Sequence, residues 1–428
     1  MTDHRIQGLP VGELAESFGT PLYVYDGDVL RDVYDGLRRL LHPAIGIFYS
    51  AKANPNVSVC ALLRSLGAGL EVSSLAELMT ARWAGAAPGD IIFLGPGKSA
   101  QELQACVDQR IRAIVCESID ELTRLEAMAP PDGISVLLRV NPEFTGTGSR
   151  LAMGGKPRQF GIDAEQLREC GPTLARLRRV RVTGFHAYMG TRILDAAGIV
   201  QNTRGILALA QELSGELGVP LETVDVGGGL GVPYFDGEKD LNVEELAAGV
   251  NDAAEEFLQG NPGCRLIMEL GRYLTGWSGI YMVTARYVKR SRGESFIVAD
   301  GGTNHHLAAV GIGSFVKRNF PVRCLSRVGE PTARRYTITG PLCTPGDVIA
   351  SAAELPEITP GDLLGVERSG AYGPTASPGL FLSHGHPAEV LVLDGEAHLV
   401  RRRDTVEDLL STQRLVPLLS SPTKGQPL

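Results

Sequence analysis

The sequence predicts an α/β protein in which an N-terminal (β/α)8 barrel is joined to a C-terminal all-β domain. Eight short apolar segments follow one another between residues 45 and 271, and segments with helical spacing separate them. Such alternation is typical of parallel β/α units, and eight units favour a closed barrel over an open doubly wound sheet. After about Gly276, strand-like segments continue without intervening helices, which indicates the second domain.

The predicted barrel strands are rich in β-branched and aromatic residues, and most of them end in Gly, Ser, Asn or Pro. In order they are 45–50, 69–74, 91–95, 113–118, 136–142, 182–190, 223–230 and 266–271. The predicted helices between them are 59–66, 75–83, 100–107, 119–128, 167–177, 199–217 and 243–258. Because such a barrel keeps its chemistry at the carboxyl ends of its strands, functional residues are expected there.

The second domain is predicted from five further strand-like segments and one at the N-terminus. These segments are 279–288, 295–300, 336–339, 362–367, 388–393 and 21–25. The expected boundaries are 28–276 for the barrel, and 1–27 together with 277–428 for the β domain.

The composition excludes several classes of protein. Acidic residues outnumber basic ones by 49 to 41, so no nucleic-acid footprint is visible. No apolar stretch is long enough to span a bilayer, and the first residues lack the layout of a signal peptide. The seven cysteines are scattered without metal-ligand spacing. They predict a reducing cytoplasm, no disulfide framework and no metal site.

Lys52 is the first candidate catalytic residue. It follows the apolar segment 45–50 and is therefore expected at the carboxyl end of the first strand. Burial there would lower the pKa of the amine and make it a nucleophile toward a carbonyl. Pyridoxal phosphate is the cofactor that most often uses such a lysine. A surface lysine at a strand end is the alternative interpretation.

The last two barrel strands are followed by residues suited to a phosphate and a pyridine ring. The glycine-rich run 227–231 can aim backbone N–H groups at a phosphate, although it is also compatible with a flexible turn. Glu269 can keep a pyridine nitrogen protonated, which makes the ring a better electron sink. Arg272 can pair with a phosphate or carboxylate, or simply form a local ion pair with Glu269.

Two residues of the β domain complete the pattern. Cys343 lies between turn residues and Asp347, where a thiol can donate a proton to a carbanion. Tyr372, in Gly-Ala-Tyr-Gly, exposes a hydroxyl that suits a phosphate oxygen. A buried structural cysteine and a packed aromatic ring are the alternatives.

Together and in this order, the motifs resemble the fold-type III pyridoxal-phosphate decarboxylases, which include the diaminopimelate, ornithine and arginine enzymes and have a barrel like that of alanine racemase. The resemblance implies that Lys52 forms the Schiff base and that Cys343 donates the proton from the opposite subunit of an obligate homodimer with shared active sites. The cofactor-binding residues that it implies are Lys52, Tyr188, Thr191, Gly228, Gly229, Leu230, Glu269, Gly271, Arg272 and Tyr372.

Departures from the family pattern narrow the substrate. Tyr188 stands where the family usually has a histidine that stacks on the ring, and Thr191 replaces a serine. Thr344 stands where an acid usually holds the distal amine of a diamino acid, and segment 300–307 lacks the arginine that grips a second carboxylate. Free diaminopimelate and ornithine are therefore disfavoured.

The chain is more similar to a subgroup that decarboxylates aspartyl, methylaspartyl or glutamyl thioesters on an acyl carrier protein in antibiotic biosynthesis. The shared features are segment 154–161, Asp300-Gly301-Gly302 followed by two histidines, and segment 343–345. The residues assigned to the substrate are Arg158, His305, His306, Thr344 and Asp347. The two histidines are also compatible with a role in stabilising their loop.

The predicted function is therefore that of a carboxy-lyase acting on the α-carboxylate of a carrier-bound L-amino-acid unit. The main alternative is a decarboxylase of a free amino acid such as meso-diaminopimelate, in lysine biosynthesis. A racemase and a non-catalytic binding protein are disfavoured because Cys343 and the cofactor residues are in place. Carrier proteins are acidic, so two basic clusters are candidate docking sites: Arg178, Arg179 and Arg181, or Lys317 and Arg318.

Overall fold

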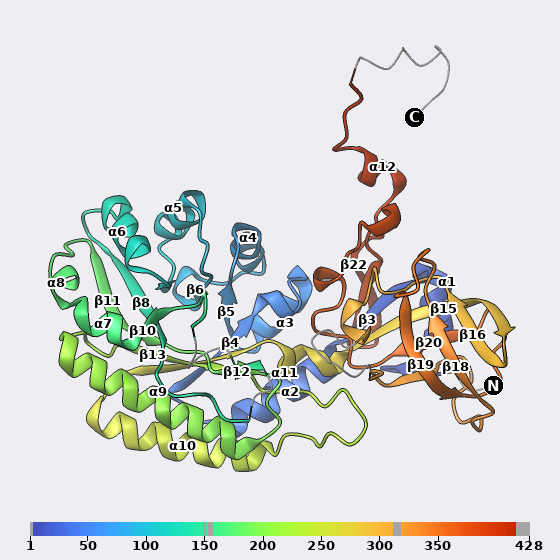
Figure 1. The fold of residues 1–428 in the computed structure, drawn as a ribbon, viewed down its shortest axis with the longest axis horizontal. Helices are drawn as coiled ribbons and strands as arrows, with labels where there is room; N and C mark the ends of the chain where they lie inside the picture. Colours follow the sequence, from blue (N-terminus) through green and yellow to red (C-terminus); the bar gives the residue numbers. More distant parts are fainter. Residues whose placement is uncertain (1–2, 149–150, 153–156, 311–317, 417–428) are drawn as a thin grey trace.

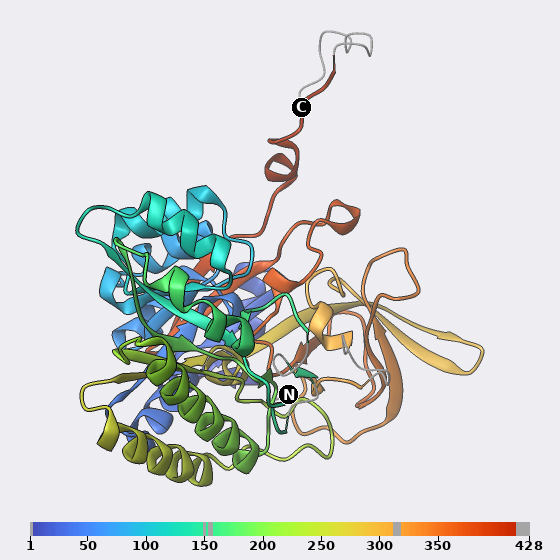
Figure 2. The ribbon, with the colours of Figure 1, turned by 60° about the vertical axis from the view of Figure 1, so that its left-hand side comes forward.

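A computed structural model describes residues 3–148, 151–152, 157–310 and 318–416. A barrel surrounded by helices lies beside a sheet domain (Figure 1), and the segment that carries α12 (Val406–Leu410) projects away from both (Figures 1 and 2).

Eight parallel strands form the barrel. They are β4 (Ile45–Ser50), β5 (Gly69–Val72), β6 (Ile91–Phe93), β7 (Ala113–Cys116), β8 (Ile134–Asn141), β11 (Val180–His186), β13 (Thr223–Gly228) and β14 (Arg265–Leu270). Each strand pairs with the next, and β14 pairs with β4, which closes the barrel. The predicted closed (β/α)8 barrel is confirmed.

Helices cover the outside of the barrel. They are α2 (Gly27–Leu40), α3 (Val57–Ser65), α4 (Leu75–Trp83), α5 (Ala100–Gln109), α6 (Ile119–Met128), α7 (Ala164–Glu169), α8 (Gly171–Leu174), α9 (Ala196–Leu217) and α10 (Val243–Gly260). Side chains cap the first backbone N–H groups of several helices, for example Ser99 at α5. The prediction of one helix over 167–177 was wrong, because the chain divides it into α7 and α8 at Gly171-Pro172.

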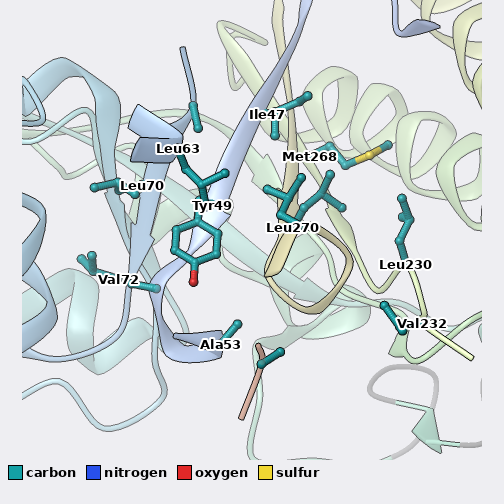
Figure 3. Close-up of a cluster of buried hydrophobic side chains, with 14 of the residues drawn as sticks. Ile47, Tyr49, Ala53, Leu63, Leu70, Val72, Leu230, Val232, Met268 and Leu270 are labelled. Atoms are coloured by element: carbon teal, nitrogen blue, oxygen red, sulfur yellow. The ribbon is translucent and has the colours of Figure 1, made fainter. Parts of the chain in front are cut away.

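The barrel strands alternate between two apolar layers. Side chains at one set of positions, including Phe48, Ile92, Val115, Leu137 and Ile267, form a compact cluster inside the barrel. The other set packs between strands and helices, as Figure 3 shows for Ile47, Tyr49, Leu70, Met268 and Leu270, with Leu63 from α3. The inward positions nearest the carboxyl ends carry polar groups instead, which places the chemistry there.

The second domain is built on a mixed sheet that includes the N-terminal strand. Its strands are β3 (Leu22–Asp26), β15 (Gly279–Ser291), β16 (Glu294–Ala299), β17 (Val322–Cys324), β18 (Arg334–Thr339), β19 (Val348–Leu355), β20 (Leu363–Val366), β21 (Ala388–Leu393) and β22 (Glu396–Arg401). As predicted, the N-terminal strand joins this domain: β3 pairs antiparallel with β15 and parallel with β21. The helix α1 (Val11–Phe18) packs Val11 and Leu14 against this sheet, so the domain is not purely β.

Candidate active site

The structure brings six predicted cofactor residues together around one cavity of about 590 Å³. Lys52 lies in the short 3-10 turn Ala51–Ala53, directly after β4, and its side chain remains 41% exposed. The six residues that line the cavity are Lys52, Tyr188, Thr191, Glu269, Arg272 and Tyr372. All of them except Tyr372 follow or end barrel strands, so the cavity lies at the carboxyl end of the barrel.

The ammonium group of Lys52 is paired with a carboxylate that the sequence reasoning missed. Lys52 Nζ lies 3.0 Å from Glu71 Oε2, and the Ser73 hydroxyl donates to Glu71 Oε1 at 3.0 Å. Desolvation lowers the pKa of Lys52, but the charges of Glu71 and Glu269 outweigh it and raise the pKa above its usual value. The expectation of a lowered pKa is therefore wrong for the cofactor-free chain.

The glycine-rich turn after β13 is shaped by close backbone contacts. A Cβ at Gly228 would lie 1.7 Å from the Glu269 carbonyl oxygen, and one at Gly229 would lie 2.1 Å from the Gly190 carbonyl oxygen. Ile193 N donates to Gly229 O at 2.9 Å, and Leu230 is buried in a bridge with Ile193. The turn is therefore a tight backbone cradle at the position where barrels bind phosphate.

Arg272 and Tyr372 meet at the same end of the cavity. Arg272 begins the short helix α11 (Arg272–Thr275), donates to the Tyr234 hydroxyl at 3.0 Å, and lies 4.5 Å from the centre of the Tyr372 ring. Tyr372 donates its backbone N–H to Ala53 O at 2.7 Å, so a sheet-domain residue is fixed beside the Lys52 turn. A Cβ at Gly271 would lie 2.8 Å from the Ala53 Cβ, so glycine lets these two turns pack.

Glu269 is a buried carboxylate whose oxygens lack partners. It is 2% exposed, and neither oxygen has a hydrogen-bond partner within the described chain. The Nε2 atom of His186 lies 3.5 Å from Glu269 Oε1. Burial would raise the pKa of Glu269, but the charges of His186 and Lys52 outweigh it and keep the pKa below its usual value. Such an ionised group fits a protonated pyridine nitrogen.

Tyr188 and Thr191 line the cavity as a neutral pair. The Tyr188 hydroxyl is hydrogen-bonded to Thr191, and desolvation raises the pKa of the phenol to about 12 despite the nearby Lys52 charge. The ring is therefore uncharged and available to lie against an aromatic cofactor. The orphaned Glu269 oxygens, the glycine cradle with Arg272, and this ring together fit the parts of pyridoxal phosphate.

Cys343 lies outside this cavity in its own chain. It is exposed in the turn 340–347, whereas the other six cysteines are buried. Asp347 holds that turn from within: its Oδ2 accepts from Leu342 N at 2.8 Å, and its Oδ1 accepts from Thr303 N at 2.8 Å. Thr344 is half-buried beside the thiol. The buried carboxylate of Asp347 therefore shapes the cysteine turn, and this favours an organising role over substrate contact.

The other predicted substrate residues lie away from the cavity lining. His305 contacts the Gly385 carbonyl oxygen at 3.0 Å, and His306 contacts Ser369 Oγ at 2.8 Å. Burial lowers the pKa of His305 to about 4 and that of His306 to about 3, so both rings are neutral and part of the sheet-domain interior. This placement favours the alternative of loop stabilisation. Arg158 is exposed, and residues 154–156 and Lys317 lie outside the described residues.

The two candidate docking clusters lie at different ends of the barrel. Arg178, Arg179 and Arg181 are at the amino end of β11, opposite the cavity, and Arg181 is ion-paired with Glu222. A carrier protein docked on these arginines would lie at the opposite end of the barrel from the cavity, so this cluster is disfavoured as the docking site.

Arg318 lies on the cavity side. Its guanidinium is 5.5 Å from the centre of the Phe235 ring. Phe235 follows Tyr234, which is the hydrogen-bond partner of Arg272.

Further lining residues come from the middle strands of the barrel, and the sequence reasoning missed them. Arg139 is buried and paired with Glu117 at 2.9 Å. Lys98 forms an ion pair with Glu121, with Nζ 2.7 Å from Oε1, and donates to two backbone carbonyl oxygens. The sequence does carry a signal for Arg139 and Glu117. Each comes two residues after an inward-facing residue of its strand, Leu137 in β8 and Val115 in β7, so its side chain also points into the barrel.

Comparisons with known proteins agree with this site. Residues 30–276 match the family model for the pyridoxal-dependent decarboxylase, pyridoxal binding domain. The chain is 38% identical to an L-glutamyl-[BtrI acyl-carrier protein] decarboxylase of Niallia circulans, over 94% of this chain and 95% of that protein. It is 32% identical to the diaminopimelate decarboxylase of Methanothermobacter thermautotrophicus, over 96% and 95% of the two chains.

A solved structure is similar over nearly the whole chain. Diaminopimelate decarboxylase of Helicobacter pylori, complexed with L-lysine, superposes with a TM-score of 0.84 at 28% identity, covering 94% of this chain and 98% of that one. The chain therefore belongs to the pyridoxal-dependent decarboxylases, and its cofactor is pyridoxal phosphate. Among the described helices, none is both long and apolar enough to cross a membrane.

Proposed function

We propose that this chain removes the α-carboxylate of an aspartyl, methylaspartyl or glutamyl unit bound as a thioester to an acyl carrier protein, in the biosynthesis of an antibiotic. The observation that carries the substrate is the 38% identity to the carrier-linked glutamyl decarboxylase, against 32% to a diaminopimelate decarboxylase. Thr344 supports it, since a neutral residue beside Cys343 offers no charge to a distal ammonium group. In a carrier-bound substrate, the covalent link to the carrier protein positions the amino-acid unit, so no charged group is needed at its distal end.

Four of the residues that line the cavity, together with the glycine turn, have roles in the proposed reaction. Bound pyridoxal phosphate supplies an electron sink for the pair left on the α-carbon when carbon dioxide departs. Lys52 provides the amine that attaches the cofactor, and Glu269 keeps the pyridine nitrogen protonated. The backbone of the glycine turn and the side chains of Arg272 and Tyr372 bind the phosphate.

The proton that returns to the α-carbon comes from Cys343 of the partner subunit. Cys343 is exposed and outside its own cavity, and the rest of the turn is held rigid by Asp347. We therefore propose a homodimer with shared active sites, in which residues 28–276 form the cofactor-binding domain and 1–27 with 277–428 supply the thiol and dimer contacts. All seven cysteines are unpaired, which suits the cytoplasm.

A second candidate function is the decarboxylation of free meso-diaminopimelate. It is favoured by the fold similarity to the Helicobacter pylori enzyme over 94% of the chain. It requires groups that hold a distal ammonium and carboxylate, and Thr344 supplies neither.

Carbon dioxide release from the purified chain with pyridoxal phosphate separates the two functions. Free L-aspartate, L-glutamate, L-lysine and meso-diaminopimelate are compared with aspartyl- and glutamyl-carrier proteins, with the Lys52→Ala variant as the background control. Turnover of a carrier-bound acid alone is expected, and it identifies the side chain. Efficient turnover of free diaminopimelate refutes the carrier-bound substrate.

A further inference from the structure

Three titratable side chains form a buried cluster at the cavity floor. His186 ends β11, Asp225 lies on β13 and Glu269 lies on β14, and one polar atom of each lies within 4.8 Å of the others. His186 and Asp225 are fully buried, at 0% exposure, and they are register partners on neighbouring strands. Of the three, only Glu269 lines the cavity, so the other two can act on a bound cofactor only through it.

The polar atoms of this cluster have few hydrogen-bond partners within the described chain. Asp225 Oδ1 accepts from Gly227 N at 2.9 Å, whereas its Oδ2 has no partner within the described chain. The same holds for both nitrogens of His186 and both oxygens of Glu269. Buried polar groups are normally paired, and two desolvated carboxyl groups this close share one proton rather than ionise together.

The surrounding charges decide which carboxyl group holds that proton. Burial, followed by the charge of Glu269, raises the pKa of Asp225 well above its usual value, and Glu71 adds to the effect. Glu269 is favoured as the anion because His186, Lys52 and Arg139 face it and outweigh the effect of its burial. Asp225 is therefore the neutral acid of the pair.

We propose that Asp225 is a positioning residue that, in its protonated form, donates a hydrogen bond to Glu269 from beneath, so that Glu269 presents its other oxygen to the pyridine nitrogen. The proposal rests on the proposed function in assigning Glu269 to that nitrogen. A neutral donor orients the carboxylate without adding a second negative charge. One anion then faces one protonated ring, with His186 on the remaining side.

Two substitutions in the full-length chain test this role. In Asp225→Asn the amide oxygen still accepts from Gly227 and the amide nitrogen still donates to Glu269, whereas Asp225→Ala loses both bonds. We expect the dissociation constant of pyridoxal phosphate in Asp225→Asn to stay within about threefold of the wild-type value. The absorption spectrum of the bound cofactor should also match that of wild type across the pH range. Asp225→Ala should weaken binding by about tenfold or more, as for loss of a hydrogen bond to a charged group. An asparagine variant that binds as poorly as the alanine variant overturns the proposal.

A second measurement needs neither cofactor nor substrate, and it stands even if Asp225→Ala fails to fold. An acid whose folded-state pKa is raised loses stability as pH rises above its unfolded value, near pH 4. The folding equilibrium constant of the cofactor-free wild type should therefore fall relative to that of Asp225→Asn, by up to about tenfold per pH unit between pH 5 and 8. A ratio that does not change with pH overturns the proposal. If the ratio changes as expected while no carrier-bound acid is decarboxylated, only the proposed function fails.

Discussion

Gly228 is the position at which a single methyl group should damage the active site most. A Cβ there would lie 1.7 Å from the carbonyl oxygen of Glu269, whereas real Cβ atoms stay beyond 3.0 Å. In Gly228→Ala, β13 and β14 must therefore separate by about 1.3 Å next to the Glu269 carboxylate. Such overpacking costs about 3 kcal/mol of unfolding free energy. Displacing one or two of the N–H groups that we propose to bind the phosphate should weaken pyridoxal phosphate binding by about 10- to 100-fold.

Gly237 offers the matched control. It has a left-handed backbone with φ of +81°, and no atom lies within 4 Å of its would-be Cβ. Gly237→Ala therefore carries backbone strain alone, about 1 kcal/mol, and should bind the cofactor normally. The assays are urea unfolding and titration of the cofactor-free chain with pyridoxal phosphate. Equal losses of stability in the two variants, with normal cofactor binding in Gly228→Ala, would show that the turn yields and does not bind the phosphate.

Three further predictions follow from the site. Glu71→Gln removes the carboxylate that lies 3.0 Å from the Lys52 ammonium group and should therefore lower the pKa of Lys52. The pH midpoint for cofactor attachment, measured by absorbance, should fall by about 1–2 units. An unchanged midpoint would refute the pairing. Arg318→Glu should slow turnover of a carrier-bound substrate and spare that of a free amino acid, while Arg181→Glu, at the far end of the barrel, should change neither; equal effects of the two would refute the docking site. Lys52→Ala and Cys343→Ala should each be inactive, yet mixed subunits should recover about one quarter of wild-type activity, because half the dimers then hold one intact site. No recovery would refute the shared site.

The fold could be predicted largely because short sequence patterns specify each strand and helix of the barrel. Each strand is a short β-branched run that ends in a turn residue, and eight such runs with helices between them leave few alternatives. Tyr372 was found by its motif, and Lys52 and Glu269 by their places at strand ends. The division of the helix predicted over 167–177 depended on one proline.

The residues that the sequence reasoning missed meet their partners only when the barrel closes. Glu71 and Arg139 lie in strands whose composition reads as apolar core, and their partners come from neighbouring strands or from the turn after β4. The raised pKa of Lys52 has the same origin, because local sequence gives burial but not the two carboxylates that oppose it. His305 and His306 were assigned to the substrate from a motif, whereas long-range packing between loops buries both rings.

The proton donors of the cavity support the proposed active site shared between two subunits. Among the described lining residues, Lys98 is ion-paired with Glu121 and donates to two carbonyl oxygens. The Tyr188 phenol, with a pKa of about 12, is a weak acid. Lys52 is the residue to which we propose that the cofactor is attached. The donor that we propose from outside the cavity is Cys343, the exposed thiol of the chain, on a turn that Asp347 holds by two hydrogen bonds. A fixed turn suits a group that must reach into a second active site, because its position is set before the subunits meet.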